Sequence, residues 1–169
     1  GTSKAGPFLE ITDEEWQNDF ELKLFAAIRL CKLALPTMKK KKWGRIINVL
    51  NIGAKAPSAN GAPTAVTRAA GLALTKVLAN TGAADNVLVN ALLVGFIKSG
   101  QWERLYERAN TDQPYEEFLQ GMVDARDIPI GRIGETTEFS SIALFLASEA
   151  GGYITGAAIN VDGGRSPVV

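Results

Sequence analysis

The sequence predicts an α/β fold in which parallel strands alternate with helices. Residues 46–50 contain a short, β-branched apolar run, which is typical of a parallel strand that is buried on both faces. A loop of small residues and an amphipathic helix follow this run, and a second apolar run occupies residues 87–93. This order of strand, helix and strand indicates a parallel sheet with helices on its faces.

The chain has 169 residues, the length of one domain, and 46% of them are hydrophobic, which is enough for a core. Its 18 basic residues balance 18 acidic residues, so no overall field attracts nucleic acid or an anionic membrane. No apolar stretch approaches the length of a membrane span. We therefore expect neither nucleic acid nor membrane as partner.

The single cysteine, Cys31, lies on the apolar face of a predicted helix and has no second cysteine to pair with. This favours a reducing, cytoplasmic setting. The chain has no histidine, which removes the commonest acid/base at neutral pH and the commonest metal ligand. We therefore expect no metal site.

The first predicted helix begins after Thr12, where Thr-Asp-Glu-Glu has the spacing of a capping box. Apolar residues then recur three and four positions apart as far as about Met38. The four lysines at residues 39–42 have two interpretations, a phosphate-binding patch or a solvated basic helix end. The second is favoured, because cations are stabilised at the carboxyl terminus of a helix.

Asn51 comes directly after the first buried strand. Ligands of open α/β sheets bind beyond the carboxyl ends of the strands, so Asn51 is a candidate site residue. Residues 53–63 form a loop of small residues that can reach over a ligand. The helix predicted at about residues 64–81 carries Thr64, Thr67 and Arg68 near its start, where side chains can point back toward the same crevice.

The remaining elements continue the alternation. After the strand at residues 87–93, the segment 94–127 predicts two short amphipathic helices in a charged context. A further helix is predicted at about residues 135–148, and a last strand at residues 157–161.

Short motifs along the whole chain carry a family resemblance. They are FELKLF, GRIIN, AAGLALTK, VNALLVGFIKS, IPIGRIGE, FLASE and YITGAAINVDGG. With these the chain resembles the short-chain dehydrogenases/reductases, in which a strand ends in Ser and Tyr-x-x-x-Lys opens the following helix. In this alignment the family's Ser falls on Asn51, its Tyr on Thr64 and its Lys on Arg68. The family's catalytic Asn falls on Lys23.

The resemblance implies a Rossmann-like, doubly wound parallel sheet. The chain, residues 1–169, would hold only its C-terminal half, about three strands with flanking helices, and residues 96–127 would form a helical substrate lobe. Gly1 matches the Gly of the family's Asn-Asn-Ala-Gly, so the Gly-rich turn that holds the cofactor pyrophosphate precedes this stretch in the family. Because a half-sheet exposes apolar edges, we expect more polypeptide in the folding unit, in cis or from a separate chain that carries the N-terminal half.

The resemblance also implies a small-molecule substrate, and NAD or NADP as cofactor. In the family, the backbone around the position of Ile97 binds the nicotinamide amide, and Val94, Gly95 and Ser99 match neighbouring cofactor contacts. Arg68 would hold the nicotinamide ribose with its positive charge. The alanine-rich helix at residues 64–81 matches one that the family uses for subunit pairing, which implies a homo-oligomer.

All four catalytic positions of the family are substituted. Thr64 is too weak an acid to replace the Tyr phenol, and Arg68 stays protonated and cannot shuttle protons. Asn51 can still donate a hydrogen bond to a carbonyl oxygen. Lys23 is the only titratable replacement, and two interpretations stay open. It acts as acid/base of a rearranged site beside Arg68, or it fills a polar hole in a disabled one.

Three functions remain open at this stage. The first is an NAD(P)-linked oxidoreductase that acts on a carbonyl or alcohol. The second is a catalytically silent member that serves as a ligand-binding or oligomer-forming subunit. The third is a non-redox lyase, dehalogenase or isomerase on the same scaffold, in which Arg68 and Asn51 hold an anion.

Overall fold

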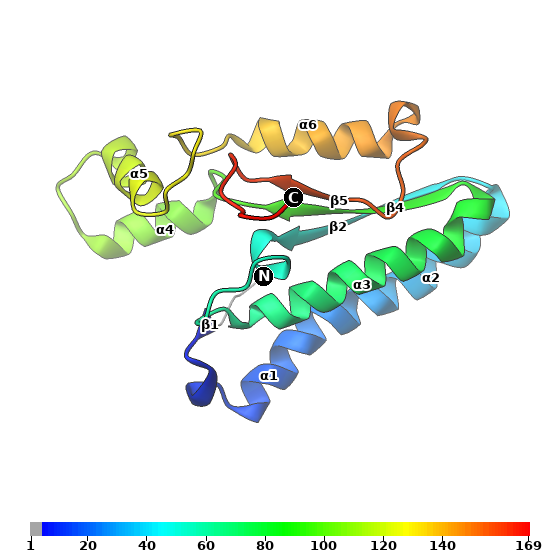
Figure 1. Ribbon diagram of the computed structural model, residues 1–169, viewed down its shortest axis with the longest axis horizontal. Coiled ribbons are helices and arrows are strands. Elements are labelled where there is room, and N and C mark those ends of the chain that lie inside the picture. Colours follow the sequence, from blue (N-terminus) through cyan, green and yellow to red (C-terminus); the bar gives the residue numbers. More distant parts are fainter. Residues whose placement is uncertain (1–4) are drawn as a thin grey trace.

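A computed structural model describes residues 5–169 of the chain. It contains a three-stranded parallel sheet with strand order β2-β4-β5, so the predicted α/β class is confirmed. Helices α2 and α3 cover one face of this sheet and α6 covers the other, while α4 and α5 lie beyond its carboxyl edge (Figure 1). The sheet consists of β2 (Gly44–Asn51), β4 (Val87–Val94) and β5 (Ala158–Val161). The main helices are α1 (Asp13–Phe20), α2 (Ala26–Lys41), α3 (Thr64–Gly82), α4 (Gly100–Ala109), α5 (Tyr115–Asp124) and α6 (Thr136–Ala147).

Strand β4 is the middle strand, and all of its residues except Val94 are buried. This explains its almost unbroken apolar sequence, since a strand with helices on both faces has no solvated side. Its one polar residue, Asn90, is satisfied: its amide nitrogen donates to the carbonyl oxygen of Ile154 over 2.8 Å, and its amide oxygen accepts from the backbone N–H of Ala157 over 3.0 Å. These bonds attach β4 to the turn that leads into β5.

The first helix differs from the single helix predicted from Thr12 to Met38. Thr12 and Glu15 do form the predicted capping box at its start. However, residues Glu21–Phe25 form a π-helical segment, η2, between α1 and α2. The apolar residues Trp16, Phe20, Leu24 and Ala27 recur three and four positions apart across this segment, so the sequence pattern does not reveal it. Such turns often mark functional sites, and this one contains Lys23.

The basic run at residues 39–42 ends helix α2, as predicted. Lys42 adopts a left-handed conformation with φ 52° and terminates the helix. Its ammonium group pairs with Asp85, and the Lys39 ammonium pairs with the same carboxylate over 3.2 Å. The structure therefore supports a paired, solvated helix end over a phosphate patch.

The described part of the chain begins with a short strand that the sequence pattern does not predict. Strand β1 (Ala5–Gly6) pairs antiparallel with β3 (Ala62–Pro63), which directly precedes α3. Strands of only two residues form because distant segments of the chain meet, so no local sequence pattern predicts them. The predicted family match of Gly1 lies outside the described residues.

The two short helices predicted within residues 94–127 are present as α4 and α5. They enclose a small core of their own, which contains Phe96, Leu119 and Val123. Across residues 5–169, no helix combines the length and the apolar character needed to cross a lipid bilayer.

Candidate functional site

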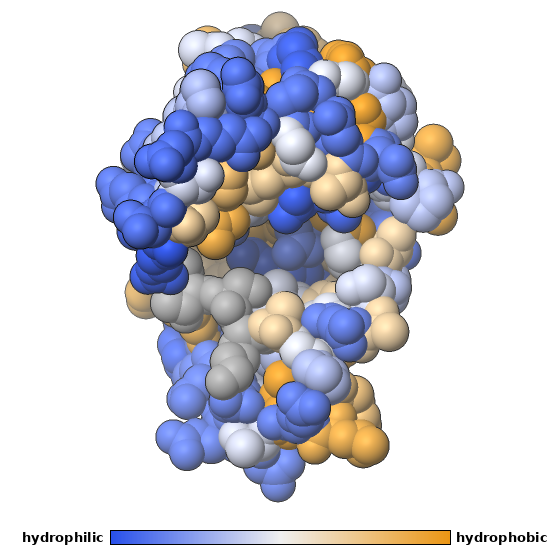
Figure 2. All heavy atoms as spheres, turned by 90° about the vertical axis from the view of Figure 1, so that its left-hand side faces the viewer, coloured by the Kyte–Doolittle hydropathy of each residue, from blue (hydrophilic) through white to orange (hydrophobic). Residues whose placement is uncertain are grey.

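A cavity of about 950 Å³ opens at the carboxyl ends of β2 and β4. Figure 2 shows this face of the molecule as a hollow with hydrophilic side chains in its depth and apolar side chains on its rim. Of the residues that the sequence placed at the site, Thr67 does not line the cavity, because it is buried and donates to Asp19. The other eight line this one cavity. They are Lys23, Asn51, Thr64, Arg68, Val94, Gly95, Ile97 and Ser99. The expected convergence of two strand ends and one helix start is thus present in the fold.

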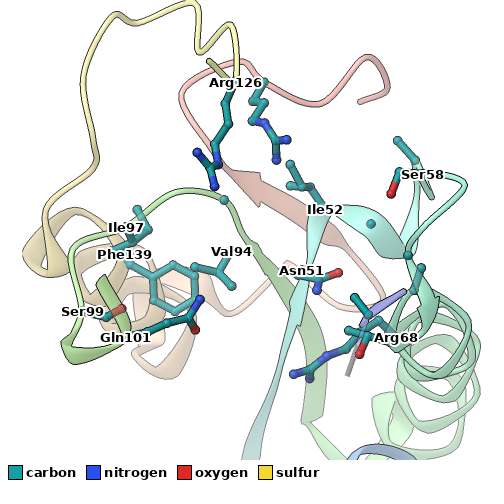
Figure 3. A pocket seen from close by; sticks show the side chains of 18 of the residues that line it. Asn51, Ile52, Ser58, Arg68, Val94, Ile97, Ser99, Gln101, Arg126 and Phe139 are labelled. Carbon is teal, nitrogen blue, oxygen red and sulfur yellow. The ribbon is translucent and has the colours of Figure 1, made fainter. Parts of the chain in front are cut away.

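Asn51 reaches the cavity because it is the last residue of β2, in register with Val94 at the end of β4. Its side chain lies at the strand tip, between the cavity walls (Figure 3). Its amide oxygen, Oδ1, is buried, and no hydrogen-bond partner for it is found within residues 5–169. A buried amide oxygen without a partner costs free energy, so a ligand that donates a hydrogen bond here would relieve that cost.

Lys23 points from the π-helical segment into a polar cluster behind the cavity wall. Its ammonium group forms an ion pair with Asp19, and both side chains are 5% exposed. The same ammonium donates to the hydroxyl of Thr64 over 3.0 Å. The charged partner of Lys23 is therefore Asp19, four residues earlier, whereas the sequence interpretation considered only Arg68 as its charged neighbour.

Asp19 is the residue that organises this cluster, and the sequence interpretation missed it. Its carboxylate accepts hydrogen bonds from the hydroxyl of Thr67 over 2.6 Å and from the hydroxyl of Thr64 over 3.3 Å, in addition to the Lys23 pair. The i, i+4 spacing of Asp19 and Lys23 is a signal that could have identified it, because such residues face each other on a helix.

Arg68 lies one helical turn after Thr64 and flanks the same side of the cavity as Asn51 (Figure 3). One of its guanidinium nitrogens, Nη1, donates to the carbonyl oxygen of Val49 over 2.8 Å. Its Nε is buried and has no hydrogen-bond partner in the described part of the chain. Burial lowers the pKa of the Arg68 guanidinium from its ordinary value, and the Asp19 carboxylate opposes this shift. The group remains a cation and a donor that points at ligand space.

The segment after β4 forms the opposite wall. Gly95 is required there, because a Cβ at this position would lie 2.5 Å from the Cα of Asp162. Ile97 forms a parallel bridge with Gly134, which holds the backbone of this wall against the loop before α6. Ser99 is the residue before α4, and its side chain forms no capping hydrogen bond with that helix. Its hydroxyl is therefore not used as a helix cap.

Two arginines, one lysine and one aspartate complete the charged lining, and the sequence interpretation missed all four. Arg126 follows α5, Arg165 follows β5, and Lys98 and Asp127 lie on the adjoining loops. Lys98 is paired with Glu135 over 3.0 Å, and this contact is the main reason that its pKa is raised. Arg126 and Asp127 approach the cavity from one segment and Arg165 from another that is distant in the sequence, so only the fold brings them together.

This donor set fits the nicotinamide end of a dinucleotide better than it fits a metal. The unpartnered Nε of Arg68 is a donor for a ribose hydroxyl, and the unpartnered Oδ1 of Asn51 is an acceptor for a hydroxyl or amide. No group of three or more metal-ligating side chains is found among residues 5–169. Chemically, the site offers a carbonyl donor, a buried ammonium and a fixed guanidinium within one cavity.

Comparison with known proteins finds similar sequences along nearly the whole chain. A sequence profile of the family described as enoyl-(acyl carrier protein) reductase matches residues 1–166. The 3-oxoacyl-(acyl-carrier-protein) reductase FabG of Aquifex aeolicus (strain VF5) is 32% identical over 164 residues, which are 97% of this chain and 62% of that protein. The chain thus spans less than two thirds of the length of this relative.

Solved structures match equally well. The NADPH-bound short chain oxidoreductase from Pseudomonas aeruginosa PAO1, described as containing an atypical catalytic center, has a TM-score of 0.91 and 31% identity, and the match covers 100% of this chain and 64% of that one. L-sorbose reductase from Gluconobacter frateurii, complexed with NADPH and L-sorbose, has a TM-score of 0.91 and 32% identity, over 100% of this chain and 65% of its own. The sheet is therefore Rossmann-like, as the motifs predicted, and the chain belongs to the short-chain dehydrogenase/reductase family.

Proposed function

We propose that the protein is an NAD(P)-linked oxidoreductase that interconverts a carbonyl and an alcohol, and that Lys23 replaces the family's tyrosine as proton donor. The observation that carries this proposal is that Lys23, Asn51 and Thr64 line the same cavity at the carboxyl end of β2. The relatives support it further, since two solved neighbours carry NADPH.

The chemistry assigned to each residue follows from its donors. A nicotinamide bound in the cavity would supply a hydride to the carbonyl carbon. The amide N–H groups of Asn51 would donate to the carbonyl oxygen and stabilise the negative charge that develops on it. An ammonium has three N–H donors, and Asp19 and Thr64 accept two of those of Lys23, so the third is left for the substrate oxygen. Lys23 would transfer this proton as the alcohol forms, and would regain one from water.

The cofactor would be held by groups that the fold leaves without a partner. Arg68 would donate from its buried Nε to a hydroxyl of the nicotinamide ribose. The backbone at Ile97 would bind the carboxamide, and the Ser99 hydroxyl would contact the cofactor from the opposite wall. Fixed donors of this kind lower the entropic cost of orienting the cofactor.

The same ion pair supports a second function. Because Asp19 neutralises Lys23 inside the protein, the alternative role of Lys23 is purely structural, as part of a polar wall of the cavity. In that case the protein is a catalytically silent, ligand-binding member of the family. The two functions predict the same binding of a dinucleotide but differ in turnover.

Measurements of NADPH and NADH binding and of NAD(P)H oxidation with a panel of carbonyl compounds separate these functions. The key variant is the double substitution Asp19→Asn with Lys23→Met, which leaves no unpaired charge in the buried cluster. It should bind the cofactor as the wild type does and lose about 10²–10⁴-fold in turnover, the usual contribution of a general acid. Lys32→Met, at an exposed position of α2, is the matched control and should change neither quantity. Cofactor binding without turnover of any carbonyl would favour the silent member, and unchanged turnover in the double variant would remove Lys23 from the mechanism.

A further inference from the structure

Two arginines face the cavity from loops that are distant in sequence. Arg126 follows helix α5, and Arg165 follows strand β5. Both line the same cavity as Asn51 and Arg68. In Figure 3 the Arg126 side chain extends into this space from the side opposite Arg68. The two arginines are therefore separate from the groups proposed to act on the carbonyl.

The Arg126 side chain is held in place by contacts along its length. Its Nη1 donates to the carbonyl oxygen of Met122 over 2.9 Å. Its guanidinium carbon lies 5.0 Å from the ring centre of Phe96 and 5.8 Å from that of Trp102. The Trp102 ring is fixed in turn, because its Nε1 donates to the carbonyl oxygen of Ile97 over 2.7 Å. A guanidinium that stacks on aromatic rings in this way is pre-organised, and its other N–H groups remain for a ligand.

Arg165 is positioned by an ordered turn. The carboxylate of Asp162 accepts from the backbone N–H groups of Gly164, over 3.1 Å, and Ser166, over 2.7 Å. The turn is joined to the loop after Arg126, because the N–H of Ile130 donates to the carbonyl oxygen of Gly163 over 3.1 Å. Gly163 has φ +65°, and a Cβ there would lie 2.6 Å from Ile130, so this close approach requires glycine.

The charge balance of the cavity leaves these two arginines uncompensated. Lys23 pairs with Asp19, and Lys98 pairs with Glu116 and Glu135. Within residues 5–169, neither Arg126 nor Arg165 forms an ion pair.

Asp127 is the one carboxylate among the described lining residues, so it offsets at most one charge. Burial lowers the pKa of Arg126, and repulsion from Arg165 lowers it further. Two like charges held near each other in this way favour an anion between them.

We propose that Arg126 and Arg165 bind an anionic group of the substrate, a carboxylate or a phosphate, at a distance from the reacting carbonyl. This inference rests on the proposed function, because it names the class of substrate that the proposed oxidoreductase would bind. It assigns specificity to the two arginines and leaves the chemistry at the carbonyl to Lys23 and Asn51. Charge-assisted hydrogen bonds from two guanidinium groups provide the required selectivity for an oxyanion over a neutral group.

The test is calorimetric titration with paired charged and neutral probes. The carboxylate pair is 4-oxopentanoate and its methyl ester, and the phosphate pair is dihydroxyacetone phosphate and dihydroxyacetone. In at least one pair the anion should bind about 10- to 100-fold more tightly than its neutral partner. Arg165→Gln and Arg126→Gln should each reduce this ratio about tenfold. Arg108→Gln, at an exposed position of α4 outside the cavity, should leave it unchanged.

Equal affinity for the charged and neutral probes in both pairs would overturn the proposal. So would a preference for anions that survives both arginine substitutions, or a loss of NADPH affinity in the variants without any change in probe affinity. Arg165→Gln keeps the test decisive if Arg126→Gln disturbs the aromatic core, because Arg165 lies exposed on a turn. The titration measures binding only. Anion selectivity without NADPH oxidation would thus reject the proposed function and retain this site, and NADPH oxidation without selectivity would do the reverse.

Discussion

Lys23 and Asp19 form an ion pair across the junction between α1 and the π-helical segment, with both side chains 5% exposed. A buried pair of this kind adds little net stability, but the loss of one partner leaves the other as a buried, unpaired charge. Lys23→Met should therefore destabilise the protein by about 3–5 kcal/mol, because Asp19 loses its counter-charge. Urea unfolding followed by circular dichroism measures this change.

The double variant Asp19→Asn with Lys23→Met should recover most of that loss, because it removes both charges together. If Lys23→Met unfolds at the wild-type urea concentration, the pair is not buried as described. If the double variant is no more stable than Lys23→Met, the coupling between the two residues is absent.

Asn51 is expected to matter for turnover and little for folding. Its amide oxygen has no hydrogen-bond partner within residues 5–169, so Asn51→Ala removes no such bond at that atom. If its amide donates to the developing oxyanion, kcat should fall about 10²–10³-fold in this variant. Steady-state kinetics and thermal unfolding measured together test both parts. Asn18→Ala, at an exposed position of α1, is the control, and an equal effect of the two substitutions on kcat would contradict the assigned role.

Gly95 fixes the distance between the end of β4 and the turn after β5. A Cβ at this position would lie 2.5 Å from Asp162, so Gly95→Ala must push the two strand ends apart. We expect a destabilisation of about 1–3 kcal/mol, as for other overpacked sites, measured by urea unfolding. Gly121→Ala is the matched control, because nothing lies within 4 Å of a Cβ in that helical position. It should leave stability unchanged or raise it by up to about 1 kcal/mol.

Glu138 ties the start of α6 to the loop before it, and its contribution should depend on pH. A hydrogen bond from Arg132, followed by one from the backbone of Glu135, lowers the pKa of Glu138 from 4.5 to about 2. Because the folded-state pKa is lower than the unfolded one, the stabilisation is complete above pH 4.5 and is lost as the pH falls toward 2.

The melting temperature of Glu138→Gln should accordingly lie below that of the wild type at neutral pH, and the difference should disappear near pH 2. Calorimetric scans at several pH values measure this. Glu107→Gln, at an exposed position of α4, should show no comparable difference. A gap between Glu138→Gln and the wild type that stays constant down to pH 2 would show that the carboxylate charge is not responsible.

The strands and most helices could be predicted because their apolar periods are local. The end of the first strand near Asn51 and the helix start at Thr64 were predicted in this way, and the second strand was predicted to end one residue before Val94. Val94 was named as a site residue only through the family resemblance. The π-helical segment could not be predicted, because the apolar residues keep their spacing of three and four positions across it. The roles of Arg126 and Arg165 could not be predicted for another reason. The two residues come together only because the turn after β5 packs against the loop that follows α5, which is a tertiary contact.

The central claim is that this altered cavity still binds a nicotinamide cofactor. Titration of the purified protein with NADPH and NADH, followed by the fluorescence of the reduced nicotinamide, tests this most directly. The account predicts saturable binding of at least one of the two cofactors, weakened when Arg68 is replaced by Met. A folded protein that binds neither cofactor would contradict it.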